Sequence, residues 1–301
     1  MIQEGRIQPG AQITVLHDTC TTTTLDGNWG FGQVVARAVA QTAIAKAHSA
    51  GLAVVTVQHC NHVGRLADFA ILAAQEDMIG FMAASGHGGG MRVSAWGGRG
   101  PSLHTNPLCV AVPAHGCPLV LDMATSVVAE GKVRLAKYRG RDVPQGWLTD
   151  ASGQQTVDPQ VLYQQPPGAL LPLGGVAGYK GFGLSLIVDI LAGALSGAGC
   201  SGSNPSARGN ALFFLVINIS HFLQVADFKV SASALIAHVK HSQSLGGYSE
   251  ITIPGEPEQN NRSRYLRSGI PLSVQLWKRL RALTLDEQYT GRSLYEIRKG
   301  V

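Results

Sequence analysis

Two histidines and a cysteine fall within four positions in the segment HCNH. His59, Cys60 and His62 supply two imidazoles and a thiol, which are common ligands of zinc. A structural zinc site needs four ligands, usually in closely spaced pairs, and the nearest later candidates along the chain show no such pairing. We therefore expect no metal here and interpret His59 and Cys60 as structural residues. A metal-dependent hydrolase that uses His59 and His62 stays open as an alternative, which bound zinc would support.

The composition is that of a globular enzyme. The chain has 301 residues, of which 45% are apolar and 14% charged, so it can build a large core. The net charge of +5 comes from basic residues that are spread along the chain. A nucleic-acid-binding surface would need a basic stripe with interleaved aromatic residues, and we expect no nucleic-acid partner. A mildly positive field can still attract anionic substrates.

The cysteines and the apolar stretches predict a cytoplasmic protein without membrane contact. None of the five cysteines belongs to a CxxC pair, which fits free thiols in a reducing compartment. The N-terminus MIQEGRIQPG lacks the apolar core of a signal peptide. The most apolar stretch, residues 181–199, is interrupted by Asp189 and rich in glycine, so we interpret it as a buried helix.

Apolar periodicity alternates between helical and extended segments. Helical spacing covers residues 33–50, 64–77, 126–140 and 178–197, and short apolar runs predict strands at 52–58, 78–85, 108–113, 118–124 and 210–218. The first 30 residues are turn-rich, and we predict no strand there. The alternation indicates an α/β or α+β fold.

The glycine-rich segments do not form a known nucleotide-binding fingerprint. A Rossmann fold would show GxGxxG directly after its first strand, and neither GHGGG, GGRGP nor GYKGFG fits that context. A P-loop is also absent from the sequence. These loops and helix starts could still cradle phosphates.

Five blocks in order resemble the malate/L-lactate dehydrogenase family. They are NHVGRLADFA, HTNPLCVAVP, LVLDMATSVVAEGKV, GYKGFGLSLIVDILAGALSGAG and PGEPEQNNRSRYLRSGIPL, and the resemblance spans nearly the whole chain. Segments such as NHVGR and VPQGWLTD look most similar to the hydroxycarboxylate dehydrogenase B branch. The resemblance implies a mixed β-sheet NAD-binding domain that is not a Rossmann fold. It implies one family unit over 1–301, with a cofactor-binding core at roughly 52–260 and a discontinuous helical accessory part at 1–51 and 261–301.

The resemblance also implies an activity. The family transfers a hydride between NAD(H) and a 2-hydroxy or 2-oxo carboxylic acid of the malate, lactate or aryl-pyruvate type, and its members pair as homodimers. NAD is the expected cofactor and NADP the alternative. The cofactor residues implied by the matched blocks are His62, Gly64, Arg65, Leu66, Val120, Leu121, Asp122, Met123, Ala124, Tyr179, Lys180, Asn210, Gly255, Glu256, Pro257 and Glu258.

Several of these residues also have a physical reading of their own. Arg65 and the N–H groups of the helix after Gly64 can meet a phosphate. Asp122 can accept ribose hydroxyls, although it could equally cap a helix. Lys180 suits a phosphate or carboxylate but could be a solvated lysine. By resemblance Thr105 lines the substrate pocket, beside a departure from the family at His104.

One expected motif does not occur in the 301 residues. Family members carry a Ser-His-Gly motif whose histidine gives a proton to the substrate, followed by an arginine that binds the carboxylate. Some relatives also use an aspartate where this chain has Lys132. We expect that the chain starts downstream of the motif, that catalysis is lost, or that another imidazole substitutes. His62 and His87 are the candidate catalytic residues, and a catalytically impaired NAD(H)-binding protein is the alternative function.

Overall fold

The computed structural model describes residues 1–203, 208–245 and 250–285. The chain divides into two compact units, residues 1–255 and 256–301. The first unit is built on a seven-stranded sheet in the order β1 (Thr14–Asp18), β2 (Thr22–Asp26), β3 (Leu52–Cys60), β10 (Arg208–Asn218), β4 (Met78–Gly88), β5 (Leu108–Val112) and β6 (Leu119–Met123). Only β2 and β3 run parallel, and every other neighbouring pair is antiparallel. The predicted mixed sheet is therefore confirmed, and it differs from the parallel sheet of a Rossmann fold.

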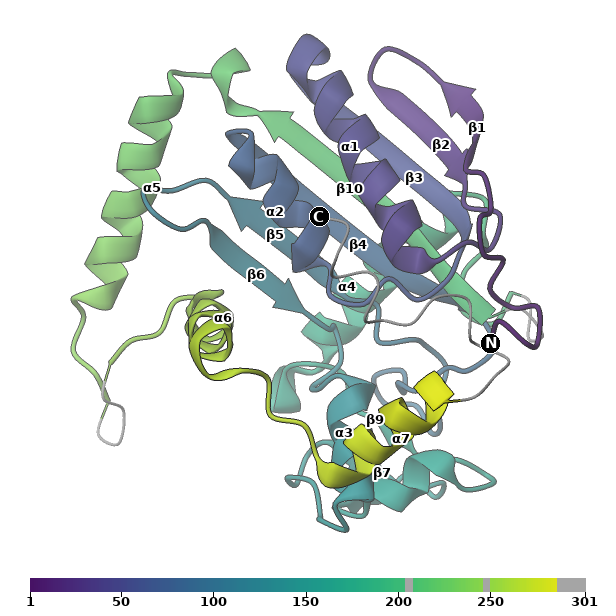
Figure 1. Ribbon diagram of the computed structural model, residues 1–301. Coiled ribbons are helices and arrows are strands. Elements are labelled where there is room, and N and C mark those ends of the chain that lie inside the picture. Colours follow the sequence, from purple (N-terminus) through teal and green to yellow (C-terminus); the bar gives the residue numbers. More distant parts are fainter. Residues whose placement is uncertain (204–207, 246–249, 286–301) are drawn as a thin grey trace. The chain divides into compact units, whose positions relative to one another are not determined.

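Helices α1 (Gly32–Ala50) and α2 (Ala67–Gln75) lie over one face of this sheet (Figure 1). Small apolar residues recur along α1 at helical spacing and are fully buried, as Val39, Ala43 and Ala47 illustrate. Gly51 ends α1 in the left-handed conformation, at a φ of 82°, and its N–H bonds the carbonyl of Ala47. Both helices were predicted from the sequence and are confirmed.

The opposite face of the sheet is covered by α4 (Tyr179–Asp189) and the single π-turn η3 (Ile190–Ala194) that continues it. Val188 and Ala192 pack against Phe213 of β10 and Ala83 of β4 in a second apolar cluster. The predicted helix at 178–197 is thus confirmed, with a change of helical type near its end.

A smaller subdomain of the same unit follows β6. It holds α3 (Glu130–Tyr138), a three-stranded sheet in the order β8 (Gln155–Thr156), β7 (Leu148–Thr149) and β9 (Ala169–Leu170), and the 3₁₀ turns η1 (Pro159–Tyr163) and η2 (Gly175–Ala177). Its apolar cluster is separate from that of the main sheet.

The remaining described helices are η4 (Ile219–His221), α5 (Val225–Lys240), α6 (Glu256–Ser268) and α7 (Val274–Leu285). The last two belong to the second unit. Within the described ranges, no helix combines the length and the apolarity needed to cross a membrane.

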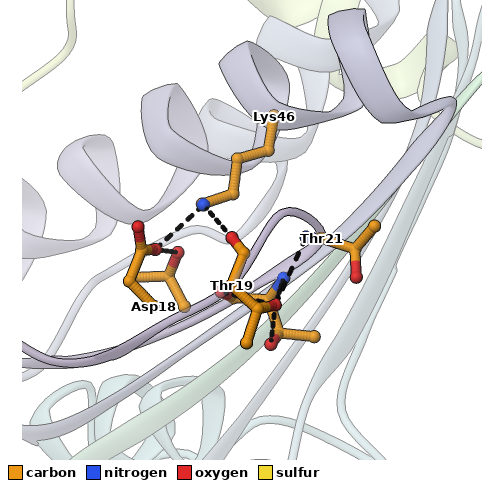
Figure 2. A network of polar contacts seen from close by, with 6 residues as sticks. Asp18, Thr19, Thr21 and Lys46 are labelled. Carbon is orange, nitrogen blue, oxygen red and sulfur yellow. Dashed lines mark hydrogen bonds and ion pairs between the residues drawn. The ribbon is translucent and has the colours of Figure 1, made fainter.

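The first 30 residues form two strands, contrary to our prediction. Strand β2 buries Thr23 and Leu25 alternately with more exposed residues, and threonine is a good strand former. The turn between β1 and β2 is tied to α1, because Lys46 Nζ lies 2.9 Å from Asp18 Oδ1 and also bonds the carbonyl of Thr19 (Figure 2). Residues 1–51 thus supply two strands of the main sheet and the helix α1. The boundary between the two compact units falls after Gly255, whereas the predicted cofactor-binding core ran from residue 52 to residue 260.

Candidate active site at the carboxyl ends of the strands

Asp122 joins two of the predicted cofactor-binding blocks. It lies near the end of β6, opposite Cys109 of β5. Its Oδ2 accepts the backbone N–H of Ala67, the first residue of α2, at 2.9 Å. The carboxylate thus takes up one of the N–H groups that we expected to meet a phosphate, and it places negative charge at the helix N-terminus. The helix that Asp122 caps is α2, not the helix that follows it in the chain.

Two more predicted residues lie next to the elements that Asp122 joins, α2 and β6. Arg65 precedes α2 and forms an exposed ion pair with Asp68 at 3.0 Å. Gly255 has a φ of 94°, and a Cβ built there would lie 3.2 Å from Val120 Cβ. Because the backbone at Gly255 runs so close to β6, this position needs glycine. Leu66 and Val120 are buried, and Leu121 is exposed.

The structure divides the predicted PGEPE turn. Pro254 accepts the N–H of Val120 at 3.2 Å and belongs to the first unit with Gly255. Glu256, Pro257 and Glu258 begin α6 in the second unit.

Thr105 contacts the segment that directly follows β6, the strand that carries Asp122. Its carbonyl accepts the N–H of Thr125 at 3.0 Å and the Thr125 hydroxyl at 3.1 Å. The next residue, Asn106, is fully buried and donates its amide to Ser185 of α4. Tyr179 and Lys180 open the same helix and are both exposed. Met123 and Ala124 complete the predicted run along β6.

A second group of predicted residues lies at one end of β3, β10 and β4. Asn210 at the start of β10 is opposite Cys60 of β3 and Gly86 of β4. Its amide donates to the carbonyl of Ser85 at 3.2 Å. His62 follows β3 and is exposed, and His87 is buried near the end of β4.

The environment of His87 favours a neutral ring. Burial lowers the pKa of His87, and the nearby His59 and His104 lower it further against the opposing effect of Asp189. Its Nε2 is buried without a hydrogen-bond partner within the described part of the chain. A ring in this state is a weak proton donor at neutral pH.

The structure also shows a pair that the sequence analysis did not predict. His59 Nδ1 lies 2.8 Å from Oδ2 of Asp26, the last residue of β2. The ring of Trp29 contacts two imidazoles, with centroids 5.1 Å from His59 and 5.7 Å from His87. The parallel pairing that sets Asp26 opposite Gln58 is a long-range feature, and no local sequence pattern indicated it.

His59, Cys60 and His62 do not form a metal site with other side chains in the described part of the chain. Among the described residues, no three histidine, cysteine or acidic side chains converge on one point. Burial raises the pKa of the Cys60 thiol to about 12, which leaves it protonated and unreactive.

The fold and these residues define a class of protein. A mixed, largely antiparallel sheet carries polar side chains at one end, together with a carboxylate at a helix start. The family model for malate/L-lactate dehydrogenase matches residues 1–281. The chain belongs to the malate/L-lactate dehydrogenase family.

Individual relatives agree with this assignment. The chain is 37% identical over 279 residues to malate dehydrogenase of Pyrococcus abyssi, which covers 90% of this chain and 76% of the relative. It is 34% identical to hydroxycarboxylate dehydrogenase B of Escherichia coli K12, over 91% of this chain and 76% of the relative. The crystal structure of malate dehydrogenase from Entamoeba histolytica superposes with a TM-score of 0.89 at 29% identity, over 94% of this chain and 81% of that one.

Proposed function

We propose that this chain transfers a hydride between NAD(H) and a 2-hydroxy or 2-oxo carboxylic acid. The relatives are named as dehydrogenases of malate, sulfolactate, lactate and hydroxycarboxylates. When bound, NADH supplies the hydride. The residues of the chain bind and orient the two reactants, exclude water and exchange the proton.

The observation that carries the proposal is the Asp122 carboxylate between β6 and the start of α2. In Rossmann folds a carboxylate near a strand end accepts ribose hydroxyls, and we propose the same chemistry for Asp122 in this different fold. It also repels a 2′-phosphate, so we propose NAD rather than NADP. In this proposal the ribose lies beside Asp122, and the phosphates are bound by Arg65 and the loop around Gly64.

The remaining predicted residues complete the proposed site. The opening of α4 offers Lys180 to an anionic group, and Thr105 is proposed to line the substrate pocket. His62, Asn210 and His87 lie around the carboxyl end of β3, where we place the reacting carbon atoms. His62 and His87 are the imidazoles that the sequence analysis offers as proton donors.

The test is NADH oxidation by the 301-residue chain with phenylpyruvate, pyruvate and oxaloacetate. We expect turnover with at least one of them. We also expect Asp122→Asn to weaken NADH binding, measured by calorimetry, by about tenfold, the equivalent of one ribose hydrogen bond to a charged group. The variant should also reduce the difference in affinity between NADH and NADPH, because it lacks the charge that repels the 2′-phosphate. Unchanged affinity for both nucleotides in that variant would contradict the proposal.

A second candidate is an NAD(H)-binding protein without dehydrogenase activity. It is favoured by the state of His87, one of the two candidate proton donors, whose buried ring has a lowered pKa and is a weak donor at neutral pH. Calorimetry separates the two: NADH binding without turnover of any 2-oxo acid supports this candidate, whereas turnover excludes it.

We further propose that the protein is a cytoplasmic homodimer. Four apolar side chains on α4 and η3 are exposed, namely Leu184, Leu186, Ile187 and Ile190, and so is Leu195 directly after η3. An exposed apolar face of this kind is typical of a subunit contact. Ile187→Glu should shift the mass measured by light scattering from dimer to monomer, whereas Val230→Glu on α5 should not.

A further inference from the structure

Asp189 carries a buried carboxylate that has no charged partner in the described part of the chain. It is the last residue of α4 and is only 3% exposed. Its two oxygens, Oδ1 and Oδ2, share a single hydrogen-bond donor, the N–H of Ser201, at 3.4 and 3.2 Å. The ion pairs among the described residues all involve other acidic groups. Because a buried charge without compensation is strongly unfavourable, this carboxylate needs a further partner.

The titratable groups around Asp189 do not supply the missing positive charge. Burial lowers the pKa of His87 and of His104, and this effect outweighs the opposing effect of Asp189 on both rings. Burial and the charge of Asp189 both raise the pKa of the Cys200 thiol, so the thiol stays neutral as well. The negative charge is therefore balanced by none of these three neighbours.

Two serine hydroxyls near this carboxylate also lack a partner. Ser85 Oγ and Ser201 Oγ are buried, and neither forms a hydrogen bond within the described structure. Ser85 is fully buried on β4 and faces η3, because Ala83, two residues earlier on the same strand, packs in one apolar cluster with Ala192. Buried hydroxyls without a hydrogen bond are uncommon in proteins, and a bound water or ion often explains them.

Oxygen atoms from three segments approach one another beside Gly193 in the π-turn η3. A Cβ built at Gly193 would lie 2.6 Å from the carbonyl oxygen of Gly199, 3.1 Å from Ser85 Oγ and 3.2 Å from Asp189 Oδ1. These atoms come from the loop after η3, from β4 and from the end of α4. A π-turn widens a helix locally and often occurs at a functional site. The absence of a side chain at Gly193 leaves the oxygen atoms facing one another.

We propose that the carboxylate of Asp189 and the oxygen atoms around it bind one monovalent alkali cation, Na⁺ or K⁺. Its ligands are Asp189 Oδ1, the hydroxyls of Ser85 and Ser201, and the carbonyl oxygen of Gly199. Hard cations prefer oxygen ligands of this kind. A single carboxylate balances a single positive charge, whereas calcium sites usually contain several carboxylates and zinc prefers nitrogen and sulfur. The site does not depend on the proposed dehydrogenase function.

A cation at this position would join three parts of the first unit. Ser201 pairs with Gly88 at the end of β4, so the loop after η3 already lies against that strand. The backbone carbonyl of Ser85 accepts the amide of Asn210 on β10 at 3.2 Å. Binding would therefore stabilise the end of the sheet that carries Asn210, one of the proposed cofactor residues.

The first test is thermal unfolding of the full chain in KCl, in NaCl and in N-methyl-D-glucamine chloride at equal ionic strength. We expect a midpoint higher by about 3 °C or more in at least one alkali salt, because a ligand of the folded state stabilises it. Asp189→Asn should abolish this difference and should be at least as stable as wild type in the glucamine salt, since it buries no charge. Ser85→Ala should reduce the difference. Asp142→Asn, at an exposed acidic residue, is the matched control and should retain it in full.

The second test locates the ion by crystallography with thallium(I), which replaces K⁺ and scatters X-rays anomalously. An anomalous peak within bonding distance of Asp189 Oδ1 and Ser85 Oγ, absent from Asp189→Asn, would support the proposal. A water molecule at this position without anomalous signal, or unfolding midpoints that are equal in all three salts, would overturn it. Neither test requires turnover, so both outcomes leave the proposed dehydrogenase function unaffected.

Discussion

Gly209 shows how tightly single residues are packed around the Trp29 ring. A Cβ built at Gly209 would lie 2.6 Å from Trp29 Cζ3, 2.8 Å from the Cys60 carbonyl oxygen and 2.9 Å from His87 Nε2. Two of these three neighbours are a backbone atom and a large ring, neither of which can move aside cheaply. The ring position therefore depends on the absence of a side chain here.

Gly209→Ala should destabilise the protein by about 1–3 kcal/mol, the usual cost of overpacking. Urea unfolding measures this loss, and near-UV circular dichroism should show a displaced tryptophan. Gly183→Ala in α4 is the matched control, since a Cβ there meets nothing within 4 Å. That variant should gain up to about 1 kcal/mol from helix propensity. Equal stability of the two variants would contradict the packing argument.

The sequence analysis named candidate residues of the site but not the contacts between them. The block match pointed to Asp122 and His62, but the carboxylate of Asp26 lies 33 positions from His59 and no spacing rule connects them. The bond follows from the parallel pairing of β2 and β3, which depends on strands that the polar threonine run concealed. Long-range register is set by the whole sheet, so local patterns do not reveal it.

At the scale of elements, Asn61 ties three separate segments together. Its side-chain amide donates to the carbonyls of Arg6, Trp29 and Gly30 at 3.1, 2.8 and 3.0 Å. The side chain is buried, so water does not replace these bonds readily. The N-terminal segment and the loop before α1 are thereby fixed against the end of β3.

Asn61→Ala should lower the free energy of unfolding by about 1–3 kcal/mol, because buried carbonyl groups lose their donor. Chemical denaturation measures this loss of unfolding free energy, and amide hydrogen exchange should become faster in the loop before α1. The exposed Asn261 on α6 bonds only within its own helix as described, to Arg264, and Asn261→Ala should change stability by less than about 0.5 kcal/mol. An equal loss of stability in Asn261→Ala and Asn61→Ala would contradict the stabilising role of the Asn61 hydrogen bonds.

Elements with a strong period were predicted correctly, and those without one were missed. The alanine and valine pattern of α1 and its glycine stop follow from local physics. Strand β1 is exposed throughout and β2 is mostly threonine, so neither has the apolar contrast that the prediction requires. The change from α4 to the π-turn η3 has no sequence signal that we can identify.

At the scale of the whole molecule, all the strands and all three apolar clusters that the structure describes lie in the first unit. A chain that ends at Gly255 should therefore fold with an unchanged sheet. We expect its urea midpoint to match that of the full chain and its circular dichroism to lose only helical signal. Aggregation or a broad, early transition would show that residues 256–301 are needed for the core.

The position of β10 has a consequence for synthesis on the ribosome. This strand lies between β3 and β4 in the sheet, yet its residues come some 120 positions after β4 in the chain. Until residue 218 has emerged, β3 and β4 both expose an unpaired edge of apolar strand. The nascent chain thus has two unpaired strand edges during a long part of its synthesis. Chaperones that bind unfolded chains would prevent these edges from pairing with other nascent chains.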